Sequence, residues 1–237
     1  MMRSTAADPS SPDARRSLDD DGFAVLGGVF TANECDELLT GIAASPFAHG
    51  AGSRQLLDLP VVAGVARRLR RVPRIADLMP LNAVAVQCTL FSKDSPSNWS
   101  VGPHQDLSIP VAACEDSPGW SGWSRKEAIW FAQAPVAVLE RMVAIRLQLD
   151  PADAESGPLR VLAGSHRVGR WSSSTLSGVD AAQLAPCIVD HGGVLVMKPL
   201  LVHASRRATS DTPRRVLHFL YAAPELPNGM RWARAVH

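Results

Sequence analysis

The chain has 237 residues, of which 46% are hydrophobic, and a formal net charge of +1. This length and apolar content suit one large domain with a buried core, and the near-neutral charge gives no support for a nucleic-acid or membrane partner. The four cysteines are widely spaced without a CxxC pair, which argues against a disulfide framework or a cysteine zinc site. The sequence shows no signal-peptide core and no apolar run long enough to span a bilayer, so we expect a cytoplasmic protein.

The N-terminal part of the sequence is expected to be helical after a flexible tail over residues 1–16. A short strand is expected within 21–30. Thr31 and Glu34 have the spacing of a capping box, and apolar residues recur at helical intervals behind them, which predicts a helix over 30–45.

A second helix is expected over 59–71, where apolar positions again recur with helical spacing and Pro73 follows as a helix breaker. Its dense arginines, within 66–74, are interpreted as the solvated face of this helix. They lack neighbouring aromatic residues that would stack on bases, which further disfavours nucleic-acid binding.

After Pro80 the pattern changes to short strands separated by Gly, Pro, Ser and Asp. Strict alternation over 82–93 would place Ala85 and Gln87 on one face and Val86 on the other. The later strand-like runs cover 104–113, 141–150, 157–166, 192–205 and 214–224. Without long helices between them, the expected fold class is mainly β with N-terminal helices, a jelly-roll or related barrel. We therefore expect one domain over 17–237, with a helical part at 17–80 and the barrel at 81–237.

The segment 112–135 is long, aromatic and without clear periodicity, which is typical of a lid or binding loop. Trp120 and Trp123 within it are candidates for contact with an organic substrate, and plain anchoring of the loop to the barrel is the alternative. Arg146 and Gln148 share a strand face expected to point into the barrel. They are interpreted either as substrate or co-substrate contacts or as a buried hydrogen-bond network.

His104 and Asp106 lie two positions apart in a strand-like run, so their side chains should project from the same face. About a hundred residues later, His203 ends a second apolar run, Ser205 follows it, and Arg214 opens the next strand. Two imidazoles and one carboxylate form the ligand set of non-haem Fe(II) oxygenases, which leaves positions for a bidentate co-substrate and O2. An arginine offers a planar fork for a carboxylate. Hydrolytic zinc remains an alternative.

The remaining histidines are interpreted as structural or inert. His49 and His237 lie in a loop and at the chain end, and His166 and His191 lie in turns after strands. His218 is a lone histidine within a strand, where an imidazole is more often a satisfied core or surface residue than a ligand.

Several motifs together resemble the phytanoyl-CoA dioxygenase family of Fe(II)- and 2-oxoglutarate-dependent oxygenases. In chain order they are "DDDGFAVLGGVFTANECDELLTGI", "PHQDLSIPV", "LERMVAIRLQLDPADAESGPLRVLAGSHRVG", "GGVLVMKPLLVHAS" and "GMRW". The resemblance covers nearly the whole chain and implies a double-stranded β-helix, the jelly-roll barrel also found in cupins. It also implies Fe(II), 2-oxoglutarate and O2 as cofactors and a small organic molecule as substrate.

By the same resemblance, His104, Asp106 and His203 would be the metal ligands. Arg214 with Ser205 would hold the distal carboxylate of 2-oxoglutarate, although a one-residue shift in strand register would exchange Arg214 with Arg215. Gln87 matches a glutamine that some relatives place near the co-substrate.

The reaction implied is hydroxylation with release of succinate and CO2. Desaturation, epimerisation and cyclisation at the same site are alternatives, as is a non-catalytic jelly-roll binding module. Because Asp106 is an acid, where related halogenases have a small residue, halogenation is disfavoured. Neither the oligomeric state nor the identity of the substrate is indicated by the sequence.

Overall fold

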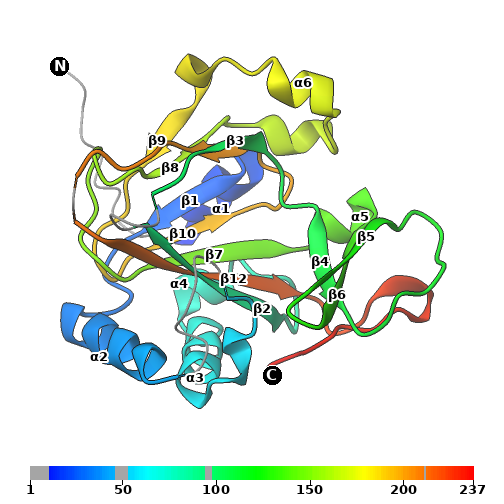
Figure 1. Ribbon diagram of the computed structural model, residues 1–237, viewed down its shortest axis with the longest axis horizontal. Coiled ribbons are helices and arrows are strands. Elements are labelled where there is room, and N and C mark those ends of the chain that lie inside the picture. The colour runs from blue at the N-terminus through cyan, green and yellow to red at the C-terminus, as the bar shows by residue number, and fades with distance from the viewer. Residues whose placement is uncertain (1–10, 46–52, 94–97, 211) are drawn as a thin grey trace.

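Five antiparallel strands form the larger sheet of the computed structural model, which describes residues 11–45, 53–93, 98–210 and 212–237 (Figure 1). In sheet order the strands are β1 (Phe23–Leu26), β10 (Val194–Met197), β7 (Val143–Gln148), β12 (Arg214–Ala222) and β2 (Val84–Lys93). Non-consecutive strands are neighbours throughout, as expected for a jelly roll rather than for a sheet of simple hairpins.

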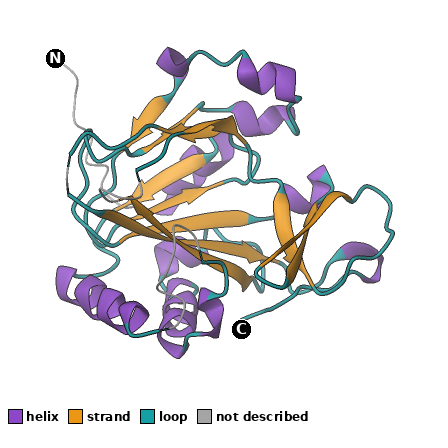
Figure 2. Cartoon of the chain, in the orientation of Figure 1, coloured by secondary structure: helices purple, strands orange, loops and turns teal. Residues whose placement is uncertain are grey.

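Two smaller antiparallel sheets complete the β-structure (Figure 2). The four-stranded sheet contains, in order, β3 (Val101–His104), β11 (His203–Ser205), β8 (Leu159–Val161) and β9 (Ala185–Cys187). The three-stranded sheet contains β4 (Ser108–Val111), β6 (Ile129–Gln133) and β5 (Ser121–Lys126). The two larger sheets are the halves of a double-stranded β-helix, so the expected fold class is confirmed.

Helices cover one face of the larger sheet (Figure 1). The covering helices are α1 (Ser11–Asp20), α2 (Ala32–Ala43), α3 (Pro60–Leu69) and α4 (Pro73–Ala76). Two short helices lie elsewhere: α5 (Val136–Leu139) joins the core between the sheets, and α6 (Ser173–Ser177) contacts β3. The apolar sides of α2 and α3 join a core with the sheet residues Leu217, Phe219 and Tyr221. The Tyr221 hydroxyl donates to the Ala66 carbonyl at 3.0 Å and so ties β12 to α3.

The helix that we expected over 30–45 is present and begins with the predicted capping box. The Thr31 side chain accepts from the Glu34 backbone N–H, and the Glu34 carboxylate accepts from the Thr31 N–H at 2.8 Å. The arginines of 66–74 are more than a solvated face. Arg68 pairs with Glu34 and lies 4.1 Å over the ring of Phe30, which joins α3 to α2.

Three sequence expectations differ from the structure. Helix α1 begins at Ser11, so the expected tail to residue 16 is too long, and residues 1–10 lie outside the described part of the chain. The alternation expected over 82–93 is interrupted by a register shift at Val86, so Ala85 and Cys88 both join the core under the helices and Gln87 lies on the face opposite Ala85. Such a bulge adds one residue to the strand and reverses the faces beyond it.

The segment 112–135 is also more regular than the sequence suggests, because most of it forms the β5–β6 hairpin. Its two-residue turn consists of Glu127 and Ala128, both with positive φ (49° and 66°). Hairpin turns of this kind normally contain Asn or Gly, so the turn signal is missing from the sequence.

Among the helices in the described ranges, none is both long and apolar enough to cross a membrane.

Candidate functional site

The two histidines singled out from the sequence face each other across neighbouring strands. His104 ends β3 and His203 begins β11, and the antiparallel register pairs them directly. Their ring centroids are 4.1 Å apart. The possible ligand atoms of His104, Asp106 and His203 all lie within 4.8 Å of one another. A span of this size allows one ion to contact all three side chains.

Backbone and side-chain hydrogen bonds of Asp106 and Gln105 hold Asp106 beside these histidines. The Asp106 N–H donates to the Pro199 carbonyl at 2.9 Å. Gln105 points away from the histidines, and its amide donates to Leu200 and Gly169 and accepts from the Trp171 N–H. The Asp106 carboxylate then lies 3.7 Å from Nε2 of His203.

Backbone carbonyls fix the tautomers of both facing histidines. Nδ1 of His104 donates to the Gly102 carbonyl and Nδ1 of His203 to the Leu201 carbonyl, each at 2.9 Å. The proton is thereby placed on Nδ1, and Nε2 keeps its lone pair for a metal. Burial lowers the pKa of His203 to about 4 despite the attraction of Asp106, so the imidazole is neutral at neutral pH.

A cavity of 80 Å³ adjoins this cluster, and we call it the metal cavity. It is lined by Phe91, Lys93, Trp99, Val101, His104, Asp106, Arg146, Leu159, His203, Ser205, Arg214 and His218. Arg214 is buried and donates from Nε to the Ser156 carbonyl at 3.0 Å. Lys93 donates to the Ser205 hydroxyl at 3.2 Å and also to the Arg206 carbonyl.

Positive charge accumulates in the metal cavity. Lys93, Arg146 and Arg214 all line it, and Asp106 is the only carboxylate among its described lining residues. Burial, followed by the charges of Arg214 and Arg146, lowers the pKa of Lys93 to about 8. Burial, followed by the charge of Arg146, lowers the pKa of Arg214 to about 10. Crowded buried cations of this kind are stabilised by a bound anion.

His218 belongs to the site although the sequence analysis treated it as structural. It is buried, its Nε2 lies 3.8 Å from the Asp106 carboxylate, and Arg146 contacts its Nδ1 at 3.0 Å. Burial, followed by the charge of Arg146, lowers the pKa of His218 to about 3. The sequence does contain a signal for this role of His218. Arg214 lies four residues earlier on the same strand, so the two side chains share one face of β12.

Arg215 projects away from the metal cavity. Its guanidinium pairs with the Asp150 carboxylate, with Nε to Oδ2 at 2.9 Å, whereas Arg214 lines the cavity. Gln148 is buried but donates to the Asp150 carbonyl and is not among the lining residues, whereas Arg146 is. Arg146 and Gln148, which were expected to share one face of β7, therefore differ: Arg146 lines the metal cavity and Gln148 does not.

The two candidate tryptophans are not at the metal cavity. Trp120 is buried in the apolar core between the sheets, and Trp123 packs against that core. These contacts correspond to the anchoring alternative. Gln87 does not line the metal cavity either, and its amide donates to the Thr89 hydroxyl at 2.9 Å.

Gln87 and Thr89 line a second cavity, of 270 Å³, that we call the hairpin cavity. It is lined by Arg54, Gln87, Thr89, Phe91, Gln105, Asp106, Leu107, Ser108, Lys126, Phe131, Gln133, His218 and Leu220. It shares Phe91, Asp106 and His218 with the metal cavity, so the two adjoin at the candidate metal ligand Asp106.

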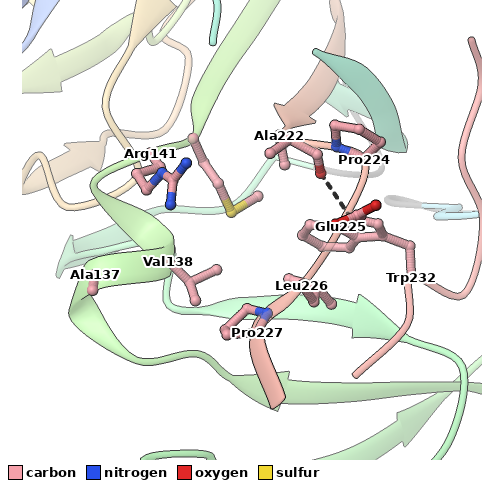
Figure 3. A pocket seen from close by; sticks show the side chains of 11 residues that line it. Ala137, Val138, Arg141, Ala222, Pro224, Glu225, Leu226, Pro227 and Trp232 are labelled. Atoms are coloured by element: carbon pink, nitrogen blue, oxygen red, sulfur yellow. Dashed lines mark hydrogen bonds between the residues drawn. The ribbon is translucent and has the colours of Figure 1, made fainter. Parts of the chain in front are cut away.

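A larger cavity, of 440 Å³, lies apart from these residues between α5 and the C-terminal segment (Figure 3). Val138, Leu226, Pro227 and Trp232 give it a mainly apolar wall. None of the candidate site residues lines it.

The chain is similar in fold to several solved structures. The epimerase SnoN from nogalamycin biosynthesis, described as non-heme and alpha-ketoglutarate dependent, is 16% identical, with a TM-score of 0.65 over 95% of this chain and 87% of that chain. EctD from S. alaskensis, solved with 2-oxoglutarate and 5-hydroxyectoine, is 18% identical, with a TM-score of 0.64 over 93% and 79% of the two chains. HygX from Streptomyces hygroscopicus, with iron bound, is 18% identical, with a TM-score of 0.61 over 89% and 86%. At these identities the likeness shows the shared fold.

Among curated proteins none matches the chain. The family model described as "Phytanoyl-CoA dioxygenase (PhyH)" matches residues 18–216, which include every site residue predicted from the sequence but not His218. The match agrees with the motif resemblance and with the His-Asp-His cluster of the structure. The chain therefore belongs to the phytanoyl-CoA dioxygenase family of Fe(II)- and 2-oxoglutarate-dependent oxygenases.

Proposed function

We propose that this chain hydroxylates a C–H bond of a small organic molecule, with Fe(II) bound by His104, Asp106 and His203. The donor set fits that ion, because it offers two neutral imidazole nitrogens and one carboxylate from adjacent strands. The pKa of Asp106 supports this role. Burial raises it, but His203, His218 and His104 outweigh burial and lower it, so the carboxylate is ionised.

The excess of cations in the metal cavity carries the proposal. Lys93, Arg146 and Arg214 converge on a space whose only described carboxylate is a candidate metal ligand. 2-Oxoglutarate is a dianion, so one carboxylate can approach the metal while the other meets these cations. Arg214 is suited to the distal carboxylate because its guanidinium is buried and held at Nε by the Ser156 carbonyl.

The surrounding residues orient the co-substrate. Lys93 and Ser205 are hydrogen-bonded to each other beside Arg214, so a carboxylate there would meet a donor group that is already organised. When bound, Fe(II) with 2-oxoglutarate and O2 supplies the oxidising power for the C–H bond, and succinate and CO2 are released.

The test combines binding and turnover. Anaerobic addition of Fe(II) and 2-oxoglutarate to the wild-type protein should produce the visible absorption band of a metal-chelated 2-oxo acid, and O2 should then yield succinate. The variant carrying both His104→Ala and Asp106→Ala should show neither. Undiminished metal binding in that variant, with a native circular dichroism spectrum, would contradict the assignment of the ligands.

A further inference from the structure

We propose that the hairpin cavity binds the organic substrate and that this substrate carries a carboxylate or phosphate group recognised by Lys126. The inference rests on the proposed function, because it assigns the second cavity beside the same metal ligands. Its volume of 270 Å³ is near the lower end of small-molecule sites, which begin at about 300 Å³. A metabolite-sized ligand therefore fits it better than a polymer or a long acyl chain.

The position of the hairpin cavity suits a substrate. Asp106 and His218 line both cavities, so a ligand in the hairpin cavity lies next to the metal ligand Asp106, whereas Lys93 and Arg214 line only the metal cavity. Co-substrate and substrate would then approach the metal from different directions. Phe91, which also lines both cavities, supplies an apolar surface between them.

The charges of the hairpin cavity favour an anion. Lys126 and Arg54 line it, and Arg170 lies beside it, donating to the amide oxygen of Gln133. The nearby acid Glu127 is bonded to Arg54, through both its side chain and its backbone N–H. The remaining carboxylate, Asp106, is assigned to the metal. Cations thus exceed the carboxylates left to pair with them among the described residues.

Lys126 is the cation best placed to receive a ligand. Its Nζ lies 5.1 Å from the centroid of the Phe131 ring, and no carboxylate oxygen of the described residues lies within 4.0 Å of it. Burial and the charge of Arg54 lower its pKa, so a bound anion would relieve an unfavourable environment. The Phe131 ring also holds the ammonium group by a cation–π contact beside the cavity.

The adjacent residue provides a matched control. Arg125 precedes Lys126 on β5, so its side chain projects to the other face, where it is exposed and contacts Trp130 and the Ala128 carbonyl. Lys126→Met and Arg125→Met therefore remove the same charge one residue apart, but only the first should change the hairpin cavity. Lys126→Glu reverses the charge at the cavity.

The experiment is calorimetric titration of the full-length protein in the presence of saturating 2-oxoglutarate. The probes are pairs of small carboxylic acids with their methyl esters and of phosphate monoesters with their parent alcohols. We expect acids or phosphates to bind at least tenfold more tightly than their neutral partners. Lys126→Met should remove this preference, Lys126→Glu should abolish anion binding, and Arg125→Met should match the wild type.

Which pair shows the preference distinguishes a carboxylate from a phosphate substrate. Anions that bind no better than their neutral partners, including a panel in which neither binds, would overturn the inference. So would an unchanged anion preference in Lys126→Met. Failure of the proposed function has a separate signature, the absence of the metal–2-oxoglutarate absorption band in the wild-type protein. Lys126→Met should leave that band and the 2-oxoglutarate affinity unchanged.

Discussion

Arg146 and His218 are directly paired across β7 and β12, with Nη1 of Arg146 3.0 Å from Nδ1 of His218. A guanidinium can only donate, so Nδ1 of His218 accepts and the neutral ring carries its proton on Nε2. That N–H faces the Asp106 carboxylate at 3.8 Å. Arg146 thus prevents His218 from acting as a fourth metal ligand and makes it a potential donor to the carboxylate ligand.

His218→Phe tests this positioning role. Phenylalanine keeps an aromatic ring but removes the N–H that faces Asp106. Loss of a partner that orients a metal ligand typically lowers metal affinity about 10- to 100-fold, and we expect a decrease in that range. Competition with a chromophoric chelator measures it. His166→Phe is the control, because His166 contacts the Asp19 carbonyl and does not line the metal cavity. Wild-type metal affinity in His218→Phe would rule out the positioning role.

Arg214→Met and Arg215→Met form a second matched pair. The first removes the buried guanidinium of the metal cavity, and the second removes a guanidinium paired with Asp150. A hydrogen-bonded charge pair contributes about 1.5–3 kcal/mol, so Arg214→Met should raise the dissociation constant of 2-oxoglutarate roughly 10- to 150-fold. Arg215→Met should leave that constant within about twofold of the wild type. Calorimetric titration with 2-oxoglutarate in the presence of metal measures both dissociation constants. A larger increase in Arg215→Met than in Arg214→Met would assign the co-substrate carboxylate to Arg215 instead.

Gly192→Ala tests the turn before β10, where Gly192 accepts a hydrogen bond from the Phe30 N–H. Gly192 has a φ of +75°, and a Cβ there would lie 2.0 Å from the Phe30 carbonyl oxygen. Left-handed backbone costs an alanine about 1 kcal/mol or more, and the clash adds to it, so we expect destabilisation by at least about 2 kcal/mol. Gly64→Ala in α3 should be neutral or stabilising, because its Cβ meets nothing within 4 Å. Urea unfolding compares the two variants.

The sequence predicted the parts of this molecule that follow periodic patterns. The capping box at Thr31 and the strands of the larger sheet are local signals, and the structure confirms them. The spacing of His104 and Asp106 is also a local signal, but the single strand expected over 104–113 is wrong, because β3 ends at His104 and β4 begins at Ser108. The distant His203 was found because it ends an apolar strand, and the family motifs then supplied its partners.

Features that depend on pairing between strands were not predicted. Lys93 lies opposite Arg214, and His218 lies opposite Arg146, only because of the registers of β12 with β2 and β7. The bulge near Val86 changes which residues of β2 share a face, and the local sequence pattern does not predict it. The β5–β6 hairpin was missed because Glu127 and Ala128 are unusual residues for a turn with positive φ.

The lowered pKa of Lys93 predicts how 2-oxoglutarate binding depends on pH. Burial and the neighbouring charges of Arg214 and Arg146 place this pKa at about 8 instead of 10.5. Below pH 8 the ammonium group is charged and attracts the co-substrate. Above pH 8 it loses its proton, so the dissociation constant of 2-oxoglutarate should rise by up to about tenfold per pH unit, with proton uptake on binding.

The stability of the unliganded protein should change in the opposite direction. Because the pKa of Lys93 is lower in the folded than in the unfolded state, the unfolded state binds the extra proton between pH 8 and 10.5, and the contribution of Lys93 to the free energy of unfolding increases there. Lys93→Met should remove both dependences, whereas Lys198→Met, outside the metal cavity, should leave the 2-oxoglutarate profile unchanged. A wild-type dissociation constant that stays flat from pH 7 to about 9.5 would show that Lys93 does not contact the co-substrate.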